Sequence, residues 1–284
     1  MIVGSKELYL KAKLGGYAVG AFNVSTPEAI HAVLEAATEL HSPVVIETSE
    51  GEKNYMGAKV AADIINDIAG DLSIPVAIHL DHGKNLESVK EVIDAGYTSV
   101  HIDASALPYE ENFEMTKAVV EYAHSKNIPV EGELGHVGGA SEIHDEVSNI
   151  EASTYTDPQK ASEFVKGTGI DVLASSIGNI HGIYENAPHL DFERLEKIGK
   201  IGIPLSLHGG SGIPEEQVKK AIALGITKVN VNTELRIAYT ETLRAELAKN
   251  PDEVVPYKYL PEEIKAIKEV VKKKIIMFGS ANKA

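Results

Sequence analysis

The chain has 284 residues, of which 43% are hydrophobic and 24% charged, a composition typical of a globular protein with one large domain or two small ones. Lys and Arg total 27 against 42 for Asp and Glu, and the net charge of −15 argues against nucleic acid or an anionic membrane as partner. The absence of cysteine excludes disulfides, thiolate metal sites, iron–sulfur clusters and cysteine nucleophiles.

Short apolar runs alternate with amphipathic helical segments along the chain. The runs predict eight strands, at residues 18–24, 43–49, 75–81, 99–104, 129–134, 171–177, 204–207 and 228–231. The helical segments between them include 27–40, 86–95, 111–125, 158–167, 191–198 and 214–224. Ala-Gly at 95–96 and Leu-Gly at 224–225 are typical of helix C-caps. From about residue 250 we expect a surface loop and then one long helix over 261–278.

Eight strands that alternate with helices in about 250 residues favour a (β/α)8 TIM barrel. A doubly wound open sheet also alternates strand and helix and stays open as the alternative. No stretch has the composition of a linker, so we expect residues 1–284 to form a single domain with a C-terminal helical extension. No apolar run approaches the ~18–20 residues of a membrane span, and the first residues lack a signal-peptide pattern, which predicts a cytoplasmic protein.

Three histidines follow the ends of three predicted strands, where the chemistry of a barrel enzyme is located. His82, His181 and His208 each precede a glycine. Three imidazoles that leave a fourth position open form a catalytic zinc site. One such histidine alone would more often be a core or loop residue, but three at matching positions favour a metal site. The other eight histidines are assigned mostly to helix faces or loops.

Acidic residues stand at the same strand ends. Asp81 precedes His82, and since neighbouring strand residues point to opposite faces, both reach one site only where the strand opens into its loop. A carboxylate beside a metal can act as general acid/base, or it can orient a ligand histidine. Asp103 and Glu133 end the fourth and fifth runs. They could support the ligands, hold an alternate metal position, or simply be buried carboxylates bonded to neighbouring strands.

A glycine-rich segment follows the seventh predicted strand. Gly209-Gly210-Ser211-Gly212 precedes a plausible helix start at Pro214. Backbone N–H groups in such loops and at helix starts bind anions, and the loops after strands seven and eight commonly hold phosphate in a barrel. The eighth run ends in Asn230-Val231-Asn232-Thr233, which adds polar side chains beside that position. Ordinary turn glycines are the alternative interpretation.

An enzyme that forms an imine with its substrate needs a lysine inside a strand, pointing into the pocket. The first seven runs contain no Lys, and Lys228 begins the eighth, which we expect to place it at the wrong end of the barrel. Any carbanion chemistry should therefore be stabilised by a metal.

These motifs resemble those of the class II, metal-dependent ketose-bisphosphate aldolases, from about residue 5 to the end of the chain. The likeness is carried by Ala-Phe-Asn at 21–23, Ser-Glu-Gly at 49–51, His-Leu-Asp-His-Gly at 79–83, Ile-Asp-Ala-Ser at 102–105, Glu-Leu-Gly at 133–135, His-Gly-Ile-Tyr at 181–184, His-Gly-Gly-Ser-Gly at 208–212 and Asn-Val-Asn-Thr at 230–233. The resemblance implies a TIM-barrel lyase of carbohydrate metabolism or glycolysis that reversibly cleaves fructose or tagatose 1,6-bisphosphate. The products would be dihydroxyacetone phosphate and glyceraldehyde 3-phosphate.

The resemblance also implies roles for the candidate residues. His82, His181 and His208 would hold one Zn2+ ion, which polarises the ketone oxygen and stabilises the enediolate, and Asp81 would move the proton of the C4 hydroxyl. The residues expected to bind the dihydroxyacetone phosphate moiety are Gly182, Gly209, Gly210, Ser211, Asn230, Val231, Asn232 and Thr233. Asn23 and Ser49 would line the pocket. Relatives commonly bind a monovalent cation, Na+ or K+, near the phosphate and form homodimers or homotetramers.

Two departures from the family pattern affect the substrate and the second proton-transfer group. Position 185 is Glu, where fructose-bisphosphate enzymes usually carry a phosphate-binding Lys; this favours tagatose, while the greater frequency of fructose enzymes favours fructose. The usual loop Glu position holds Ser141, so Glu142, with Asp145 or Glu146 as alternatives, is expected to act as the second acid/base. An aldolase for another phosphorylated keto-sugar or keto-acid, and a non-catalytic sugar-phosphate-binding subunit, remain alternatives.

Overall fold

Eight parallel strands form a closed barrel in the order β1-β10-β9-β7-β5-β4-β3-β2. The computed structural model describes residues 1–144, 154–184 and 189–284. The barrel strands are β1 (Val19–Asn23), β2 (Val44–Ser49), β3 (Val76–Gly83), β4 (Ser99–Ile102), β5 (Val130–Leu134), β7 (Val172–Ser175), β9 (Leu205–Leu207) and β10 (Ile226–Val231). Each overlaps one of the eight predicted runs. The predicted (β/α)8 barrel is confirmed, and the open sheet is excluded because β1 pairs with β10 and closes the ring.

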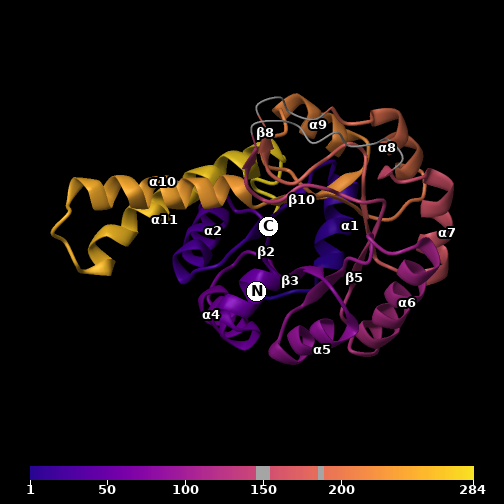
Figure 1. The fold of residues 1–284 in the computed structure, drawn as a ribbon, viewed down its shortest axis with the longest axis horizontal. Helices are drawn as coiled ribbons and strands as arrows, with labels where there is room; N and C mark the ends of the chain where they lie inside the picture. Colours follow the sequence, from indigo (N-terminus) through magenta and orange to yellow (C-terminus); the bar gives the residue numbers. More distant parts are fainter. Residues whose placement is uncertain (145–153, 185–188) are drawn as a thin grey trace.

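Helices surround the barrel (Figure 1). Those on its outer wall are α2 (Pro27–Glu39), α4 (Ala58–Gly70), α5 (Leu86–Ala95), α6 (Tyr109–Ser125), α7 (Pro158–Thr168), α8 (Phe192–Gly199) and α9 (Glu215–Ala223), and the short α3 (Glu50–Met56) follows β2 directly. Side-chain caps fix several starts: Thr26 Oγ1 accepts the Ala29 N–H and Asn85 Oδ1 accepts the Ser88 N–H. The predicted C-cap at Gly96 is confirmed, with a left-handed φ of +106°.

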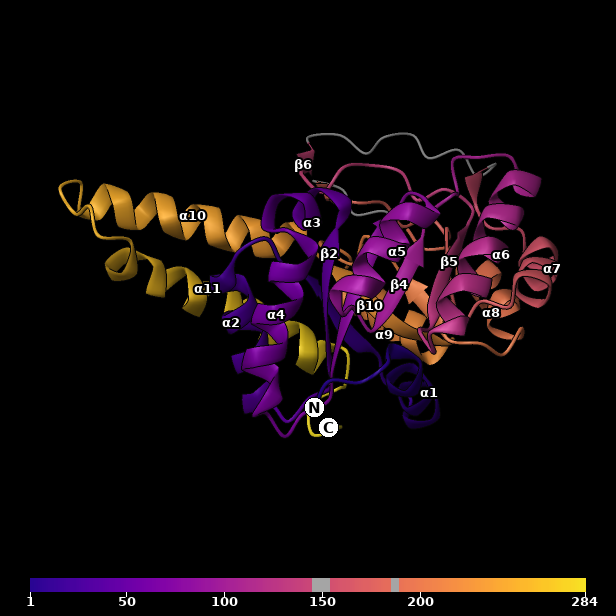
Figure 2. The ribbon, with the colours of Figure 1, turned by 90° about the horizontal axis from the view of Figure 1, so that it is seen from below.

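The amino-terminal end of the barrel is closed by α1 (Ser5–Gly15), which contacts β1, β3 and β10. Figure 2 shows α1 and both chain termini at one end of the molecule, with α3 and β6 at the other. The buried residues of α1 pack on apolar side chains at the bottom of the barrel, namely Val19, Ala21, Val45, Ala77 and Val172. This plug leaves the opposite end, where the strands finish, for polar residues.

Side chains inside the barrel lie on three levels because alternate residues of a strand point inward. The apolar level against α1 comes first. Two residues further along the strands is a charged level, made of Glu47, His79, Glu131 and Lys228. Two residues further again is the level at the strand ends, made of Asn23, Ser49, Asp81, Glu133 and Asn230. The strand period therefore determines which residues meet at the open end.

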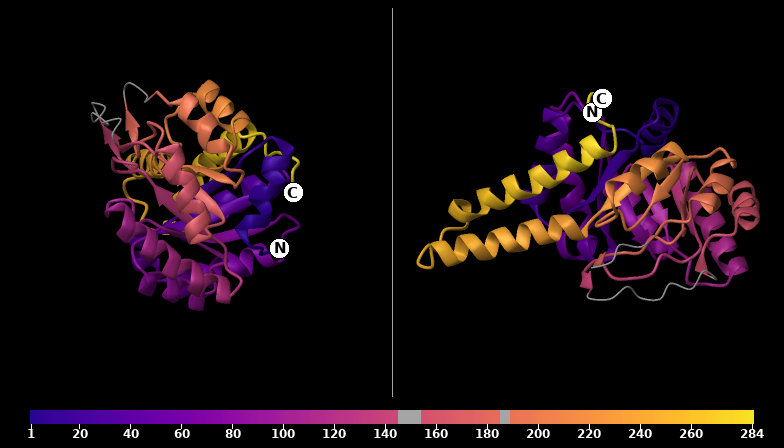
Figure 3. Two further views of the ribbon diagram at one scale, coloured as in Figure 1. Left: turned by 90° about the vertical axis from the view of Figure 1, so that its right-hand side faces the viewer. Right: turned by 90° about the horizontal axis from the view of Figure 1, so that it is seen from above.

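The C-terminal part forms a helical hairpin that projects from the barrel (Figures 1 and 3). It consists of α10 (Thr233–Lys249) and α11 (Pro256–Met277). The predicted start at 261 is wrong by five residues: α11 begins at Pro256, and Pro261 lies inside it. Proline is favoured in the first turn of a helix, so both Pro256 and Pro261 were candidates for the start of this helix. None of the described helices is both long and apolar enough to cross a membrane.

Two further strands, which the sequence did not predict, join the loops that follow β5 and β7. β6 (Ile143–His144) and β8 (Ile183–Tyr184) form a two-stranded parallel sheet. The Ile183 N–H donates to the Glu142 carbonyl at 2.9 Å, and the ring of His144 stacks on Tyr184 with centroids 4.7 Å apart. This sheet holds the segment around Glu142 beside the segment that carries His181.

Candidate active site

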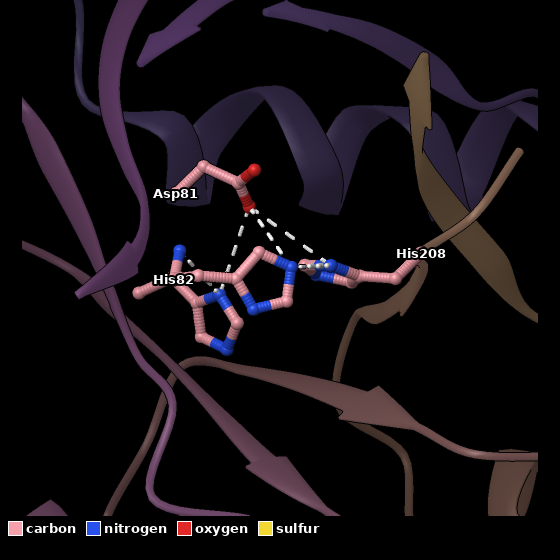
Figure 4. A group of neighbouring side chains, drawn as sticks. Asp81, His82 and His208 are labelled. Carbon is pink, nitrogen blue, oxygen red and sulfur yellow. Dashed lines mark hydrogen bonds and ion pairs between the residues drawn. The ribbon is translucent and has the colours of Figure 1, made fainter. Parts of the chain in front are cut away.

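Three histidines meet at the open end of the barrel, where His82 contacts both of the others. His82 Nε2 lies 3.2 Å from His181 Nε2 and 3.0 Å from His208 Nδ1. Tetrahedral ligands at a zinc–nitrogen distance of about 2.0–2.1 Å would stand about 3.3 Å apart, so these separations suit a small metal ion. Figure 4 shows the Asp81 carboxylate directed toward the rings of His82 and His208.

The second ring nitrogen of each histidine is also bonded. His82 Nδ1 donates to Asp103 Oδ2 at 2.9 Å and His208 Nε2 donates to Glu131 Oε1 at 2.8 Å. His181 Nδ1 donates to the Gly138 carbonyl at 3.3 Å. These bonds fix the tautomer that leaves the converging nitrogens with free lone pairs, as metal ligands require. The tautomer of each ring therefore fits a metal ion, as do the two separations from His82.

An irregular end of β3 allows Asp81 and His82 to reach the same site. His82 adopts a left-handed backbone conformation with φ of +51°. The pairing of β3 with β4 shifts register between Leu80 and Gly83. The expected opening of the strand at this point is thus confirmed. A non-glycine residue in this conformation costs about 1–3 kcal/mol, and such strain is found mostly at functional sites.

Asp81 is held as an ionised carboxylate beside the converging nitrogens. It is 4% exposed, and Oδ1 lies 3.8 Å from His82 Nε2 and 3.9 Å from His208 Nδ1. Asn23 Nδ2 donates to Oδ2 at 3.0 Å and Asn230 Nδ2 donates to Oδ1 at 3.1 Å. Burial alone would raise the pKa of Asp81, but the adjacent imidazoles outweigh it and hold the pKa well below its usual range. The carboxylate is therefore a proton acceptor in a fixed position.

The three imidazole rings differ in the direction of their pKa shifts: the pKa is lowered for His181 and His208 and raised for His82. Burial, with a smaller contribution from nearby His82, lowers the pKa of His181 to about 3. Burial also lowers the pKa of His208 to about 4. Burial would lower the pKa of His82 too, but Asp81 and Asp103 raise it to about 10. His181 and His208 are therefore neutral near pH 7, and His82 carries the proton that a metal ion would displace.

Asp103 and Glu133 both lie near His82 Nδ1, but only Asp103 is within hydrogen-bond distance of it. Asp103 accepts from His82 Nδ1 and, at 2.9 Å, from Lys84 Nζ, which suits a carboxylate that orients a ligand. Glu133 Oε2 is 4.0 Å from His82 Nδ1 and 3.6 Å from His101 Nε2. Burial and the charge of Asp103 raise the pKa of Glu133 to about 7.

Two histidines that were not predicted to belong to the site also lie inside the barrel. His79 belongs to β3 and His101 to β4, in agreement with the predicted strands at 75–81 and 99–104, and both are fully buried. The His82 backbone N–H donates to His101 Nδ1 at 3.2 Å, and His79 Nδ1 bonds to Ser99 Oγ at 2.7 Å. The signal was available, because His79 stands two residues before Asp81 on the same inward face.

Lys228 also lies inside the barrel, one level below the histidines. The expectation that it stands at the wrong end is wrong, because β10 begins two residues earlier, at Ile226. Its Nζ donates to Glu131 Oε2 at 2.9 Å and to His79 Nε2 at 3.2 Å. Burial would lower the pKa of Lys228, but Glu131 and Glu47 outweigh it and raise the pKa. Lys228 is thus a buried cation that does not line the pocket, so it is not placed to form an imine with a substrate there.

Replacing Lys228 with Met is expected to destabilise the metal-free protein by about 3–5 kcal/mol, because Glu131 would be left as an uncompensated buried charge. The measurement is the urea midpoint after chelation of any metal. Adding Glu131→Gln should recover part of the loss. Lys59→Met, which breaks an exposed pair with Asp63, is the matched control and should change the midpoint little. A Lys228→Met midpoint equal to that of the unmodified chain would contradict this view of the charged level.

A pocket of about 270 Å³ opens above the histidines. Besides Asp81, His82 and His181, the predicted site residues that line it are Asn23, Ser49, Glu142, Gly182, Gly209, Ser211, Asn230, Asn232 and Thr233. Gly210 and Val231 do not: the Gly210 N–H donates to the Asn230 carbonyl, and Val231 packs in the core between strands and helices. Glu142 is exposed on its loop, while Asp145, Glu146 and Glu185 lie outside the described residues.

Two of the pocket glycines cannot be replaced without moving the backbone. Gly209 has φ of +65°, and a Cβ there would lie 2.1 Å from the Ile180 carbonyl oxygen. Gly182 has φ of +107°, and a Cβ there would lie 2.7 Å from the carbonyl oxygens of Ala140 and Glu142. The wall above the metal-binding point is therefore bare backbone, the kind of surface that phosphate groups approach closely.

Neither Arg236, which lines this pocket, nor Glu52, which bonds to Arg236, was predicted from the sequence. Arg236, in the first turn of α10, is the only Lys or Arg among the described residues that line it. Its Nη2 donates to Oε1 of the buried Glu52 at 2.7 Å. A clue to Arg236 was in the sequence, since it follows Thr233 by three residues and the eighth strand leads directly into a helix.

Comparison with known proteins identifies the family of this chain. A family model for class-II fructose-bisphosphate aldolase matches residues 3–283. Two relatives named fructose-bisphosphate aldolase, from Staphylococcus epidermidis and Geobacillus stearothermophilus, are 46% and 48% identical, and each comparison covers 100% of this chain and 99% of the relative. The crystal structure of the YdjI aldolase from Escherichia coli K12 matches with a TM-score of 0.87 and 36% identity over 100% of both chains. The resemblance seen in the motifs is confirmed, and the chain belongs to the class II fructose-bisphosphate aldolase family.

Proposed function

We propose that this chain is a zinc-dependent aldolase that reversibly cleaves a ketose 1,6-bisphosphate to dihydroxyacetone phosphate and glyceraldehyde 3-phosphate. The observation that carries the proposal is the contact of His82 Nε2 with ring nitrogens of His181, at 3.2 Å, and of His208, at 3.0 Å, next to the buried Asp81 carboxylate. Residues 1–284 would act as one catalytic domain, which the family match over residues 3–283 supports.

The residues would divide the chemistry as follows. His82, His181 and His208 would hold the zinc ion, which supplies Lewis-acid polarisation of the substrate's ketone oxygen when bound. Asp81, aligned by Asn23 and Asn230, would take the proton of the C4 hydroxyl as the C3–C4 bond breaks and return it in synthesis. Glu142, on the loop over the pocket, would be the second proton-transfer group.

The two ends of the substrate would bind different surfaces. The phosphate of dihydroxyacetone phosphate would be bound by the segment Gly209–Ser211, by Gly182, and by residues 230–233 at the start of α10, where backbone N–H groups favour an anion. Arg236 is 44% exposed and also donates to the Ser141 carbonyl at 3.3 Å, which places it at the pocket rim. We assign the second phosphate to Arg236.

Fructose 1,6-bisphosphate is the substrate we propose first, because the curated relatives of similar length are named for it. Glu185 still argues for tagatose. The monovalent cation, the homodimer or homotetramer and the cytoplasmic location stay predictions.

The test is cleavage of fructose and tagatose 1,6-bisphosphate side by side, before and after chelation and again after addition of zinc. We expect activity that is lost with the chelator and restored by zinc, and the ratio of the two kcat/KM values identifies the sugar. Zinc bound without cleavage of either sugar would indicate another phosphorylated keto-sugar or keto-acid. Neither zinc nor cleavage would favour a non-catalytic sugar-phosphate-binding subunit.

A further inference from the structure

Glu52 lies beside the pocket and contacts four of the residues that line it. It is 6% exposed and occupies the third position of α3, where it forms a capping box with Ser49. Its Oε2 accepts the Ser49 N–H at 2.8 Å and the Ser49 hydroxyl at 2.9 Å. A capping box needs only the bond from the Ser49 N–H and a second bond, in which the Glu52 N–H donates to the Ser49 hydroxyl oxygen. The remaining contacts of Glu52 therefore need another explanation.

Those contacts all go to residues that line the pocket. Oε2 also accepts from Asn23 Nδ2 at 3.1 Å. Oε1 accepts from Arg236 Nη2 at 2.7 Å and from Asn232 Nδ2 at 3.4 Å. One buried carboxylate thus joins side chains from β1, from the end of β2, from the end of β10 and from α10. The two oxygens have different partners, since Oε2 supports Ser49 and Asn23 while Oε1 supports Arg236.

We propose that Glu52 is a positioning residue that determines specificity for a phosphate at the far end of the substrate. A free guanidinium at a pocket rim has many rotamers. If the side chain is not held in place, its loss of conformational entropy on binding weakens the affinity for the substrate. The charge-assisted bond to Glu52 holds Arg236 in place before the substrate binds and uses one of its five N–H donors. A second donor bonds to the Ser141 carbonyl. The other donors remain for the distal phosphate. This inference rests on the proposed function, because it assigns that phosphate to Arg236.

Glu52→Gln separates the specificity role from the capping role. In this variant the single side-chain carbonyl oxygen can keep the contacts to Ser49 and Asn23, but the new NH2 group would then face the Arg236 guanidinium, where neither group can accept a hydrogen bond. We expect kcat/KM for fructose 1,6-bisphosphate to fall by about 10- to 100-fold, the usual effect of losing a charged hydrogen bond. Fructose 1-phosphate, which lacks the distal phosphate, should be cleaved as well as before. In an Arg236→Met background, Glu52→Gln should have no further effect on either sugar.

Glu50→Gln is the matched control. Glu50 stands in the same first turn of α3, but its partners Lys53, at 3.1 Å, Lys84 and Ser88 do not line the pocket. It should leave the preference between the two sugars unchanged. Zinc content and the thermal midpoint of each variant show whether the fold and the metal site are intact.

A second readout needs no turnover. Binding of glyceraldehyde 3-phosphate alone, measured by calorimetry, should weaken about tenfold in Glu52→Gln, whereas no aldol reaction occurs without dihydroxyacetone phosphate. If the unmodified chain cleaves neither sugar, the proposed function fails, and this affinity still decides the role of Glu52. Equal losses for both sugars, or an unchanged affinity for glyceraldehyde 3-phosphate, would overturn the proposal.

Discussion

Replacing His181 with Ala is expected to abolish both bound zinc and cleavage of the ketose bisphosphate while the barrel stays folded. Two imidazoles would remain, whereas catalytic zinc sites keep three protein ligands. His181 lies on the loop after β7, so its removal leaves the strands and the core intact. Loss of the several kcal/mol that a Lewis acid contributes predicts a fall in kcat of at least about a thousandfold. The measurements are metal content after dialysis, far-UV circular dichroism and kcat.

The control for this variant is a histidine that makes a bond away from the pocket. His124→Ala removes a partly exposed ring that bonds to Asp171 at 2.9 Å, and it should keep zinc and activity. Full activity of a metal-stripped His181→Ala sample would refute the metal mechanism. Loss of helical signal in His181→Ala would instead show that His181 supports the fold.

The barrel was predictable because its signals are local and repeated. Each apolar run ends near a polar or glycine residue, and closure of the barrel brings all eight ends to one rim. The two-residue strands β6 and β8 carry no such signal, since they exist only because two long loops meet. The place of Lys228 was mispredicted by an error of two residues in the start of a strand, the least certain feature of such predictions.

The meeting of His82, His181 and His208 was predictable for the same reason, but the contact of Glu52 with Arg236 was not. In the sequence both are charged residues in the first turn of a helix, which usually face solvent. They are 184 residues apart. The barrel order places β1 between β2 and β10, so the helices that follow β2 and β10 both begin beside the end of β1. Only the closure of the sheet brings the two side chains together.

Asp81→Asn is expected to keep zinc and lose most of its turnover. The substitution preserves the shape of the side chain but removes the negative charge that, on the proposed mechanism, takes the proton of the C4 hydroxyl. Loss of a positioned general base typically lowers kcat by about 10²- to 10⁴-fold. The converging nitrogens of His82 and His208 do not depend on Asp81 for their tautomer, because Asp103 and Glu131 fix them from the other side. Zinc content and kcat at saturating substrate are the two quantities to measure.

Asp103→Asn is the informative comparison because it should give the reverse pattern. Asp103 contacts the non-converging nitrogen of His82, and loss of such a partner typically lowers metal affinity by about 10- to 100-fold. With excess zinc, Asp103→Asn should therefore recover most of its kcat, whereas Asp81→Asn should recover none. If Asp81→Asn instead loses zinc and is rescued by excess metal, Asp81 supports the metal site and the proton must be moved by another group, with Glu142 the first to test.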